Sequence, residues 1–115
     1  MNEDVDRKML HGCLEMLVLA CLAKEERHGY GMRKDMSDRS RSYFCPAFGR
    51  LYPLLAALEQ RGLVRSRRQK AGKSRVIRVY SLTLAGRREL SWRLDKWRMF
   101  SRRMEDLLAD CPRPA

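Results

Sequence analysis

Hydrophobic residues between Met9 and Leu22 recur every three or four positions, which is the spacing of one face of a helix. Two acidic residues, Asp4 and Asp6, lie just upstream, where the positive end of a helix dipole favours negative charge. The pattern therefore predicts a first helix over residues 9–22. The apolar positions of its stripe are Leu10, Cys13, Leu14, Leu17, Val18 and Cys21.

The two segments that follow carry weaker patterns. The polar stretch KEERHG interrupts the periodicity, and residues 29–38 (GYGMRKDMSD) resume it only through Tyr30 and Met36. This predicts a short second helix. Residues 39–47 hold a proline and two serines without periodicity, so they are expected to connect helices.

Leucines define a third helix after this connection. Gly62 supplies a usual C-terminal stop. If the helix starts near Gly49, Pro53 lies within about the first four residues, whose amide hydrogens have no intrahelical acceptor. The predicted inward positions are Leu51, Leu54, Leu55 and Leu58, and the outward positions are Arg50, Tyr52, Pro53 and Ala57.

The C-terminal half predicts a hairpin and a long helix. The β-branched and basic segments LVRSRRQ and RVIRVYSL are separated by KAGKS, whose glycine permits a tight turn. Thr83 is a suitable N-cap for a helix that runs to about Ala109 and is roughly 40 Å long. A heptad-like seam follows it through Leu90, Leu94, Trp97, Ser101, Met104 and Leu108, widened by Phe100 and Leu107.

This order of elements predicts the fold class. Three helices, a basic two-stranded hairpin and a long helix describe a mainly α fold with a small β-hairpin wing, a winged helix-turn-helix, plus a long C-terminal dimerisation helix. We expect a DNA-binding domain over residues 1–82, whose N-terminal helix also joins the dimer contact. Residues 83–110 form the dimerisation helix, and residues 111–115 a flexible tail.

Charge is concentrated in the middle of the chain. The formal net charge is +11, and residues 39–78 hold eleven basic residues and a single acid, Glu59, so +10 of that charge lies there. A segment of this kind indicates binding to a polyanion. The alternative is a basic face that is only solvated.

Other classes of function find little support. Cys13, Cys21, Cys45 and Cys111 show no CxxC spacing, so reduced thiols without a metal are expected, the first two as small core residues. No apolar run is long enough to span a membrane and no secretory signal is visible, which favours a cytoplasmic protein. His11 and His28 belong to no catalytic pattern, so we do not expect an enzyme.

The outward side of the third helix suits nucleic acid. Arg50 can reach a guanine edge or a phosphate, and Tyr52 can lay its ring on a sugar or a thymine methyl while its hydroxyl bonds a phosphate. The alternative is that Tyr52 packs against the second helix and Arg50 is merely solvated.

Four segments together resemble the PadR-like transcriptional regulators over residues 10–108. They are LHGCLEMLVLACLA, HGYGM, FGRLYPLLAALEQRGLV and VYSLTLAGRREL. The resemblance implies a winged helix with a C-terminal helix that dimerises. The single last helix is similar to that of the compact subgroup of the family. Members of this subgroup often sense small aromatic or drug-like compounds at the dimer interface.

The resemblance also assigns candidate site residues. DNA contacts are expected from Gly29, Tyr30, Tyr43, Arg50, Tyr52, Pro53, Lys70, Lys73, Ser74 and Arg75. The dimer interface is expected to include Leu10, Leu14, Leu90, Leu94, Trp97, Phe100, Met104 and Leu108. An effector would meet Trp97 and Phe100, although Trp97 and Trp92 can equally be ordinary packing aromatics.

Two functional hypotheses remain. The first is a homodimeric, sequence-specific repressor that binds double-stranded DNA at an inverted-repeat operator and is released by a small aromatic effector, with no other cofactor. The second is a constitutive basic interaction module that binds nucleic acid or other polyanions without ligand control.

Overall fold

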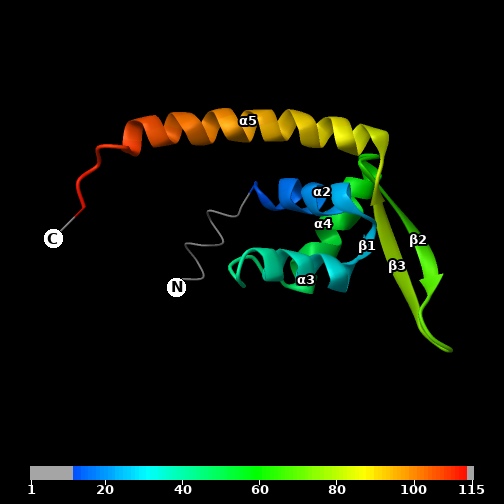
Figure 1. The fold of residues 1–115 in the computed structure, drawn as a ribbon. Coiled ribbons are helices and arrows are strands. Elements are labelled where there is room, and N and C mark those ends of the chain that lie inside the picture. The colour runs from blue at the N-terminus through cyan, green and yellow to red at the C-terminus, as the bar shows by residue number, and fades with distance from the viewer. Residues whose placement is uncertain (1–11, 114–115) are drawn as a thin grey trace.

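The computed structural model describes residues 12–113 of the 115-residue chain. The expectations that concern Asp4, Asp6 and Leu10 lie outside these residues. The fold is a winged helix-turn-helix with a long C-terminal helix, as the sequence predicts (Figure 1). Its elements are α2 (Leu14–Lys24), β1 (Arg27–His28), α3 (Gly29–Arg39), α4 (Phe48–Gln60), β2 (Val64–Lys70), β3 (Val76–Leu82) and α5 (Leu84–Leu108).

Helices α2, α3 and α4 enclose the hydrophobic core, and together with the sheet we call them the head. The predicted inward residues of α4 are buried, except that Leu54 is half-buried. Burying one such side chain contributes roughly 1.5–3 kcal/mol, so this core is the main source of stability. The largest fully buried side chains are Val18, Leu19, Cys21, Leu22, Met32, Leu51, Leu55 and Leu58.

Two leucines expected at the dimer interface belong to this core instead. Leu14 is 4% exposed and Leu90 is 7% exposed, and both lie in the core cluster, against which Leu94 also packs. The apolar seam of α5 therefore begins inside the head. Among the seam positions, the large apolar side chains are exposed only from Trp97 onward, whereas Leu84 and Trp92 are exposed outside the seam.

The sheet has three strands rather than the two that the sequence predicts. Strands β2 and β3 form the expected antiparallel hairpin, with Val64 opposite Leu82 and Lys70 opposite Val76. The short strand β1 pairs with the other side of β3, so the strand order is β1-β3-β2. Beyond β1 the hairpin projects away from the helices as a wing (Figure 1).

Our explanation of Pro53 is wrong, because α4 begins earlier than expected. The N-cap is Ala47, whose carbonyl accepts hydrogen bonds from the amides of Arg50 and Leu51. Pro53 therefore lies inside the helix, where it has no N–H to donate to the carbonyl of Gly49. Both residues are exposed, so water or a ligand can reach that carbonyl.

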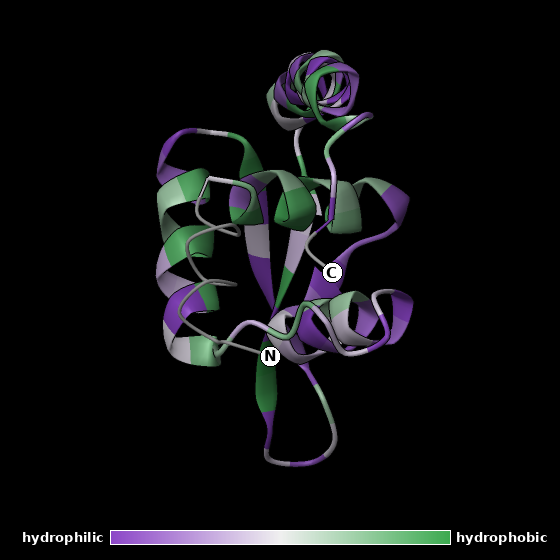
Figure 2. Ribbon diagram, turned by 90° about the vertical axis from the view of Figure 1, so that its left-hand side faces the viewer, coloured by the Kyte–Doolittle hydropathy of each residue, from purple (hydrophilic) through white to green (hydrophobic). Residues whose placement is uncertain are grey.

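The start of α5 is fixed to the turn that follows α4. As predicted, Thr83 is the N-cap, and its hydroxyl oxygen accepts a hydrogen bond from the Gly86 amide at 3.0 Å. The Thr83 amide donates to the Leu63 carbonyl at 3.2 Å. From this anchor α5 crosses over α2 and runs past its end (Figure 1). Seen end-on in Figure 2, α5 lies outside the group formed by the other helices and the sheet.

We expect Gly86→Ala to lower the free energy of unfolding by about 2 kcal/mol. An added Cβ would lie 2.0 Å from the Leu63 carbonyl oxygen and 2.7 Å from the Leu82 side chain. The matched control is Gly49→Ala, because a Cβ at this helical glycine meets nothing within 4 Å. Denaturant unfolding measures both variants. Equal stabilities would show that α5 tolerates a larger residue at this contact.

Candidate nucleic-acid interface

The outward face of α4 carries the residues expected to contact DNA. Tyr52 and Pro53 are exposed, and Arg50 is half-buried. No side chain caps the start of α4, and the Arg50 amide donates to the Ala47 carbonyl, so the amides of Phe48 and Gly49 are the ones left for a ligand. Free amides and the positive end of the helix dipole suit a phosphate group.

Tyr52 joins this face to the start of α3. A Cβ built on Gly29 would lie 2.5 Å from the Tyr52 hydroxyl oxygen, so a larger residue at this position would displace the ring. The Tyr52 ring also stacks on Phe48, with 5.7 Å between the ring centroids. Tyr52 nevertheless remains 45% exposed. It therefore packs on the second helix of the motif and still presents a surface to a ligand.

The first turn of α3 is capped by His28. Its Nδ1 accepts a hydrogen bond from the Gly31 amide at 2.8 Å, and its ring contacts the edge of the Tyr30 ring. Gly29 is buried beneath Tyr52, whereas Tyr30 is 61% exposed. Tyr30 is thus the side chain of this turn that is free to meet a ligand.

The connection from α3 to α4 has a defined conformation. The hydroxyl of Ser40 donates to the Met36 carbonyl at 2.6 Å and accepts from the Phe44 amide at 2.8 Å. Arg41 and Ser42 have positive φ angles of 54° and 66°, a conformation that non-glycine residues rarely adopt. The chain turns sharply there and leaves Tyr43 exposed in the segment that leads to α4.

The wing carries the largest group of exposed cations. Lys70, Lys73 and Arg75 are exposed at its tip, together with Ser74. Within residues 12–113 none of these three cations forms an ion pair, whereas Arg67 nearer the helices pairs with Glu26. The tip therefore keeps its charge for an external anion.

Glu59, the single acid of the basic segment 39–78, is held by hydrogen bonds to Ser66. One carboxylate oxygen accepts a hydrogen bond from the Ser66 amide at 3.0 Å, and the Ser66 hydroxyl donates to the same carboxylate at 2.8 Å. Arg78 in turn donates to the Ser66 hydroxyl at 3.0 Å. Glu59 thus ties the end of α4 to the base of the wing.

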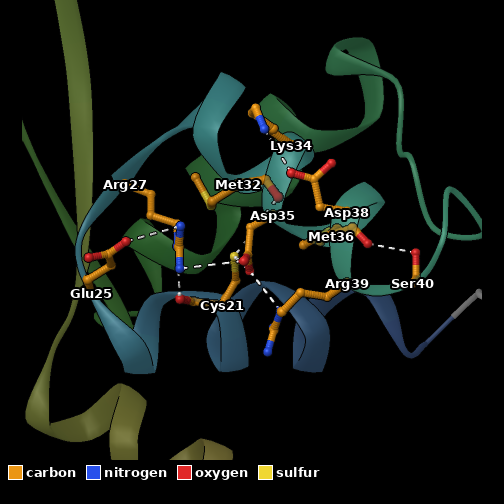
Figure 3. Close-up of polar contacts among 10 residues, drawn as sticks. All are labelled: Cys21, Glu25, Arg27, Met32, Lys34, Asp35, Met36, Asp38, Arg39 and Ser40. Carbon is orange, nitrogen blue, oxygen red and sulfur yellow. Dashed lines mark hydrogen bonds and ion pairs between the residues drawn. The ribbon is translucent and has the colours of Figure 1, made fainter.

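A polar cluster behind the interface joins α2, β1 and α3 (Figure 3). The Cys21 thiol donates to the Asp35 carboxylate at 3.1 Å. The same carboxylate pairs with Arg27 at 3.6 Å and with Arg39 at 3.2 Å. Arg27 also donates from Nε to the Cys21 carbonyl at 3.3 Å. The cluster holds α3 at a fixed position on α2.

This environment sets the protonation of both central groups. Burial, followed by the hydrogen bond to Asp35 and its charge, raises the pKa of Cys21 to about 12. Cys21 is therefore a protonated core thiol, as predicted. Partial burial acts to raise the pKa of Asp35, but the Cys21 hydrogen bond and the charges of Arg27 and Arg39 outweigh it and lower that pKa. Cys45 and Cys111 are exposed free thiols.

The predicted site residues thus form two groups in space. The starts of α3 and α4 meet through Gly29 and Tyr52, whereas the tip of the wing lies away from both (Figure 1). Sequence reasoning missed the role of His28 as a cap and of Phe48 as a stacking partner. A histidine just before a short helical pattern was an available signal for the cap. The Gly29–Tyr52 contact joins distant residues and has no local signal.

Residues 12–113 show neither a metal site nor a membrane-spanning helix. No cluster of three or more His, Cys, Asp or Glu side chains there could hold a metal ion. None of the helices in that range has the length and apolar character needed to cross a membrane.

The fold and this arrangement define a winged helix-turn-helix protein with a basic wing. The chain belongs to the PadR-like family of transcriptional regulators, because the family's sequence profile matches residues 18–92, more than half of the chain. Membership in a family of regulators agrees with the expectation that the protein is not an enzyme.

Three relatives show the extent of the similarity. A PadR family regulator from Eggerthella lenta shares 29% identity and a TM-score of 0.81, over 94% of this chain and 92% of its own. PadR of Bacillus subtilis, solved in complex with operator DNA, shares 26% identity and a TM-score of 0.67, over 71% of this chain and 46% of its own. The transcriptional regulator YqjI of Escherichia coli is 29% identical over 57% of this chain and 32% of its own. The chain thus spans about a third of the length of the curated relatives that it matches.

We expect Asp35→Asn to lower the free energy of unfolding at pH 7 by about 1–3 kcal/mol, because it weakens three partners at once. Since folding lowers the Asp35 pKa, the carboxylate stabilises the fold above its unfolded pKa of about 4, and this contribution disappears as the pH falls through the folded pKa. The difference from the wild type should therefore narrow below pH 4.

The control for this experiment is Asp38→Asn on the same helix. Asp38 is 62% exposed and pairs with Lys34, so its replacement should cost only about 0–0.5 kcal/mol. Denaturant unfolding between pH 2 and pH 7 measures both variants. An Asp35→Asn deficit that stays constant with pH would show that the charge of Asp35 is not what stabilises the cluster.

Proposed function

We propose that this protein is a homodimeric DNA-binding repressor that reads an inverted-repeat operator with α4. The observation that carries the proposal is the outward face of α4, where Tyr52 lies against the start of α3 and Arg50 comes two residues before it, in the same domain as a charged wing. A protein that only neutralised anions would not need an aromatic ring held at this place. The similarity to PadR of Bacillus subtilis, which was solved with operator DNA, supports the same conclusion.

Each element has a separate role in this proposal. Arg50 reaches a base edge or phosphate in the major groove, and Tyr52 and Pro53 contact sugar, phosphate or a thymine methyl. Tyr30 at the start of α3 binds a neighbouring phosphate, as does Tyr43, while the Gly31 amide of that turn stays bonded to His28. The wing tip, with Lys70, Lys73, Ser74 and Arg75, contacts the adjacent backbone or minor groove.

Dimerisation in this proposal uses the exposed part of α5. Phe100 is 60% exposed and Leu107 is 84% exposed, on a helix whose earlier turns are packed on the head. Apolar side chains in such a row favour a partner, and a second copy of α5 offers a matching row. The expected interface residues are Leu94, Trp97, Phe100, Met104 and Leu108; the contribution of Leu10 stays a prediction.

Effector control is the finest part of the proposal. The rings of Trp97 and Phe100 stack with centroids 6.1 Å apart, and both are exposed in this single chain. Two such pairs facing one another across a dimer would make a site for a flat aromatic compound. Binding there would change the spacing of the two α4 helices and release the operator.

Selection of bound sequences from a random duplex library should enrich an inverted repeat with half-sites roughly 34 Å apart. Arg50→Ala should relax the preference at one position of each half-site at a cost of about 1–3 kcal/mol. Lys73→Ala is the matched comparison, because loss of a phosphate contact should weaken all sequences alike and reduce the salt slope by about one.

An absence of enrichment, with only salt-sensitive binding to any polyanion, would favour the alternative of a constitutive basic interaction module. The selected operator also tests effector control. If no aromatic compound shifts its affinity, and Trp97→Ala changes no response, the effector part of the proposal is wrong.

We expect Phe100→Glu to raise the dimer dissociation constant by at least about tenfold, because the charge would be buried against a second helix. Met99→Glu is the control, since Met99 is also exposed but its position lies on the opposite side of the helix from the seam. Sedimentation at several concentrations measures both. If both substitutions weakened the dimer equally, the interface would lie elsewhere.

A further inference from the structure

We propose that Arg33 and Phe48 are positioning residues that hold the Tyr52 side chain in the orientation required for DNA reading. The inference rests on the proposed function of α4 and extends it to two residues that need not touch DNA themselves. Neither residue stands out in the sequence patterns. The structure links Arg33 to Phe48 and Phe48 to Tyr52 by two successive contacts, and a third contact joins Arg33 to the backbone just before α4.

The first contact is the stack between Phe48 and Tyr52. The two rings lie 26° from parallel with centroids 5.7 Å apart, and they are four residues apart on α4, which places them on one side of the helix. Gly29 lies against the hydroxyl end of the Tyr52 ring. Tyr52 is therefore supported along one face and at its tip, while nearly half of its surface stays open.

The second and third contacts come from Arg33 on α3. Its guanidinium carbon lies 5.1 Å from the centroid of the Phe48 ring, within the range of a cation–π interaction. Its Nε also donates a hydrogen bond at 2.9 Å to the carbonyl of Pro46, in the segment that leads into α4. Arg33 thus clamps both the first ring of the stack and the backbone just before it.

These contacts give Tyr52 a defined orientation before any ligand binds. A tyrosine that rotated freely would lose that freedom on reaching DNA and would weaken binding accordingly. The stack also connects α3 with the start of α4, because Arg33 and Gly29 both belong to α3. The two helix starts that face DNA are therefore fixed relative to each other.

Phe48 also packs against the hydrophobic core, so a purely structural role is the competing explanation. The two roles make different predictions about Tyr52. If Phe48 acts through Tyr52, its replacement should matter only while Tyr52 is present. If Phe48 only stabilises the core, its effect should be the same with and without Tyr52.

The experiment is a double-mutant cycle on the selected operator. We expect Phe48→Leu and Arg33→Lys each to reduce operator affinity about five- to tenfold in the wild-type background, and less than about twofold in the Tyr52→Ala background. Phe48→Tyr keeps an aromatic ring and should retain affinity. Arg88→Lys makes the same substitution on α5, away from the stack, and should change nothing. Thermal unfolding identifies variants that are folded at the assay temperature; if Phe48→Leu is not, Arg33→Lys carries the cycle.

A second measurement needs no DNA. In protein labelled with carbon-13 on its tyrosine rings, the Tyr52 signal is assigned by its loss in Tyr52→Phe. Removal of the Phe48 ring current and clamp should shift this signal in Phe48→Leu and Arg33→Lys but not in Arg88→Lys.

An unchanged Tyr52 signal, or equal losses of affinity with and without Tyr52, would overturn the positioning role. If the two variants shift the Tyr52 signal but the wild-type protein selects no operator, the proposed function is refuted, and with it any role of the stack in DNA reading.

Discussion

The position of α5 depends on one close contact between two stretches of backbone. Gly86 lies so near the Leu63 carbonyl that only a hydrogen atom fits between them, and the Thr83 amide bonds the same carbonyl. The helix therefore leaves the head in one direction. That direction places Leu90 in the core and the apolar side chains after Trp97 outside it. Leu63 follows directly after the turn that ends α4. The start of the proposed dimer helix is therefore held next to the end of the proposed reading helix.

Much of the fold could be predicted because its elements repeat a local pattern. A few consecutive residues are enough to indicate the leucine stripe of α4, the β-branched hairpin or the Thr83 cap. The structure confirms all three. Strand β1 is too short to show a pattern, since only its pairing with β3 makes it a strand. The apolar residues of the α5 seam have the same spacing along the whole helix, so sequence alone could not show that Leu90 is buried. The sequence predicts the outward residues of α4, but part of the support of Tyr52 comes from Gly29 and Arg33 on a separate helix, α3.

Within residues 12–113, the acidic residues of the head pair with groups inside the head, so the cations of the wing tip are left without acidic partners. Glu15 pairs with Arg61 and with Arg93, at 3.2 Å and 2.9 Å, and so joins α2 to the end of α4 and to α5. Asp35 holds α3 on α2, and Glu59 holds the wing base. These carboxylates are engaged between elements, Glu15 and Asp35 in ion pairs and Glu59 in hydrogen bonds to Ser66. The cations of the wing tip have no such partner within the described part of the chain, and they extend the field of the protein outward.

The length of α5 has a mechanical consequence. It contains 25 residues and is held on the head over its first turns, from Gly86 to Leu94. The part beyond Leu94 is about 21 Å long, so a tilt of about 5° where it leaves the head moves the opposite end by about 2 Å. A displacement of that size is more than half the length of a hydrogen bond, so a small rotation at the head is enough to change which side chains face each other at the far end.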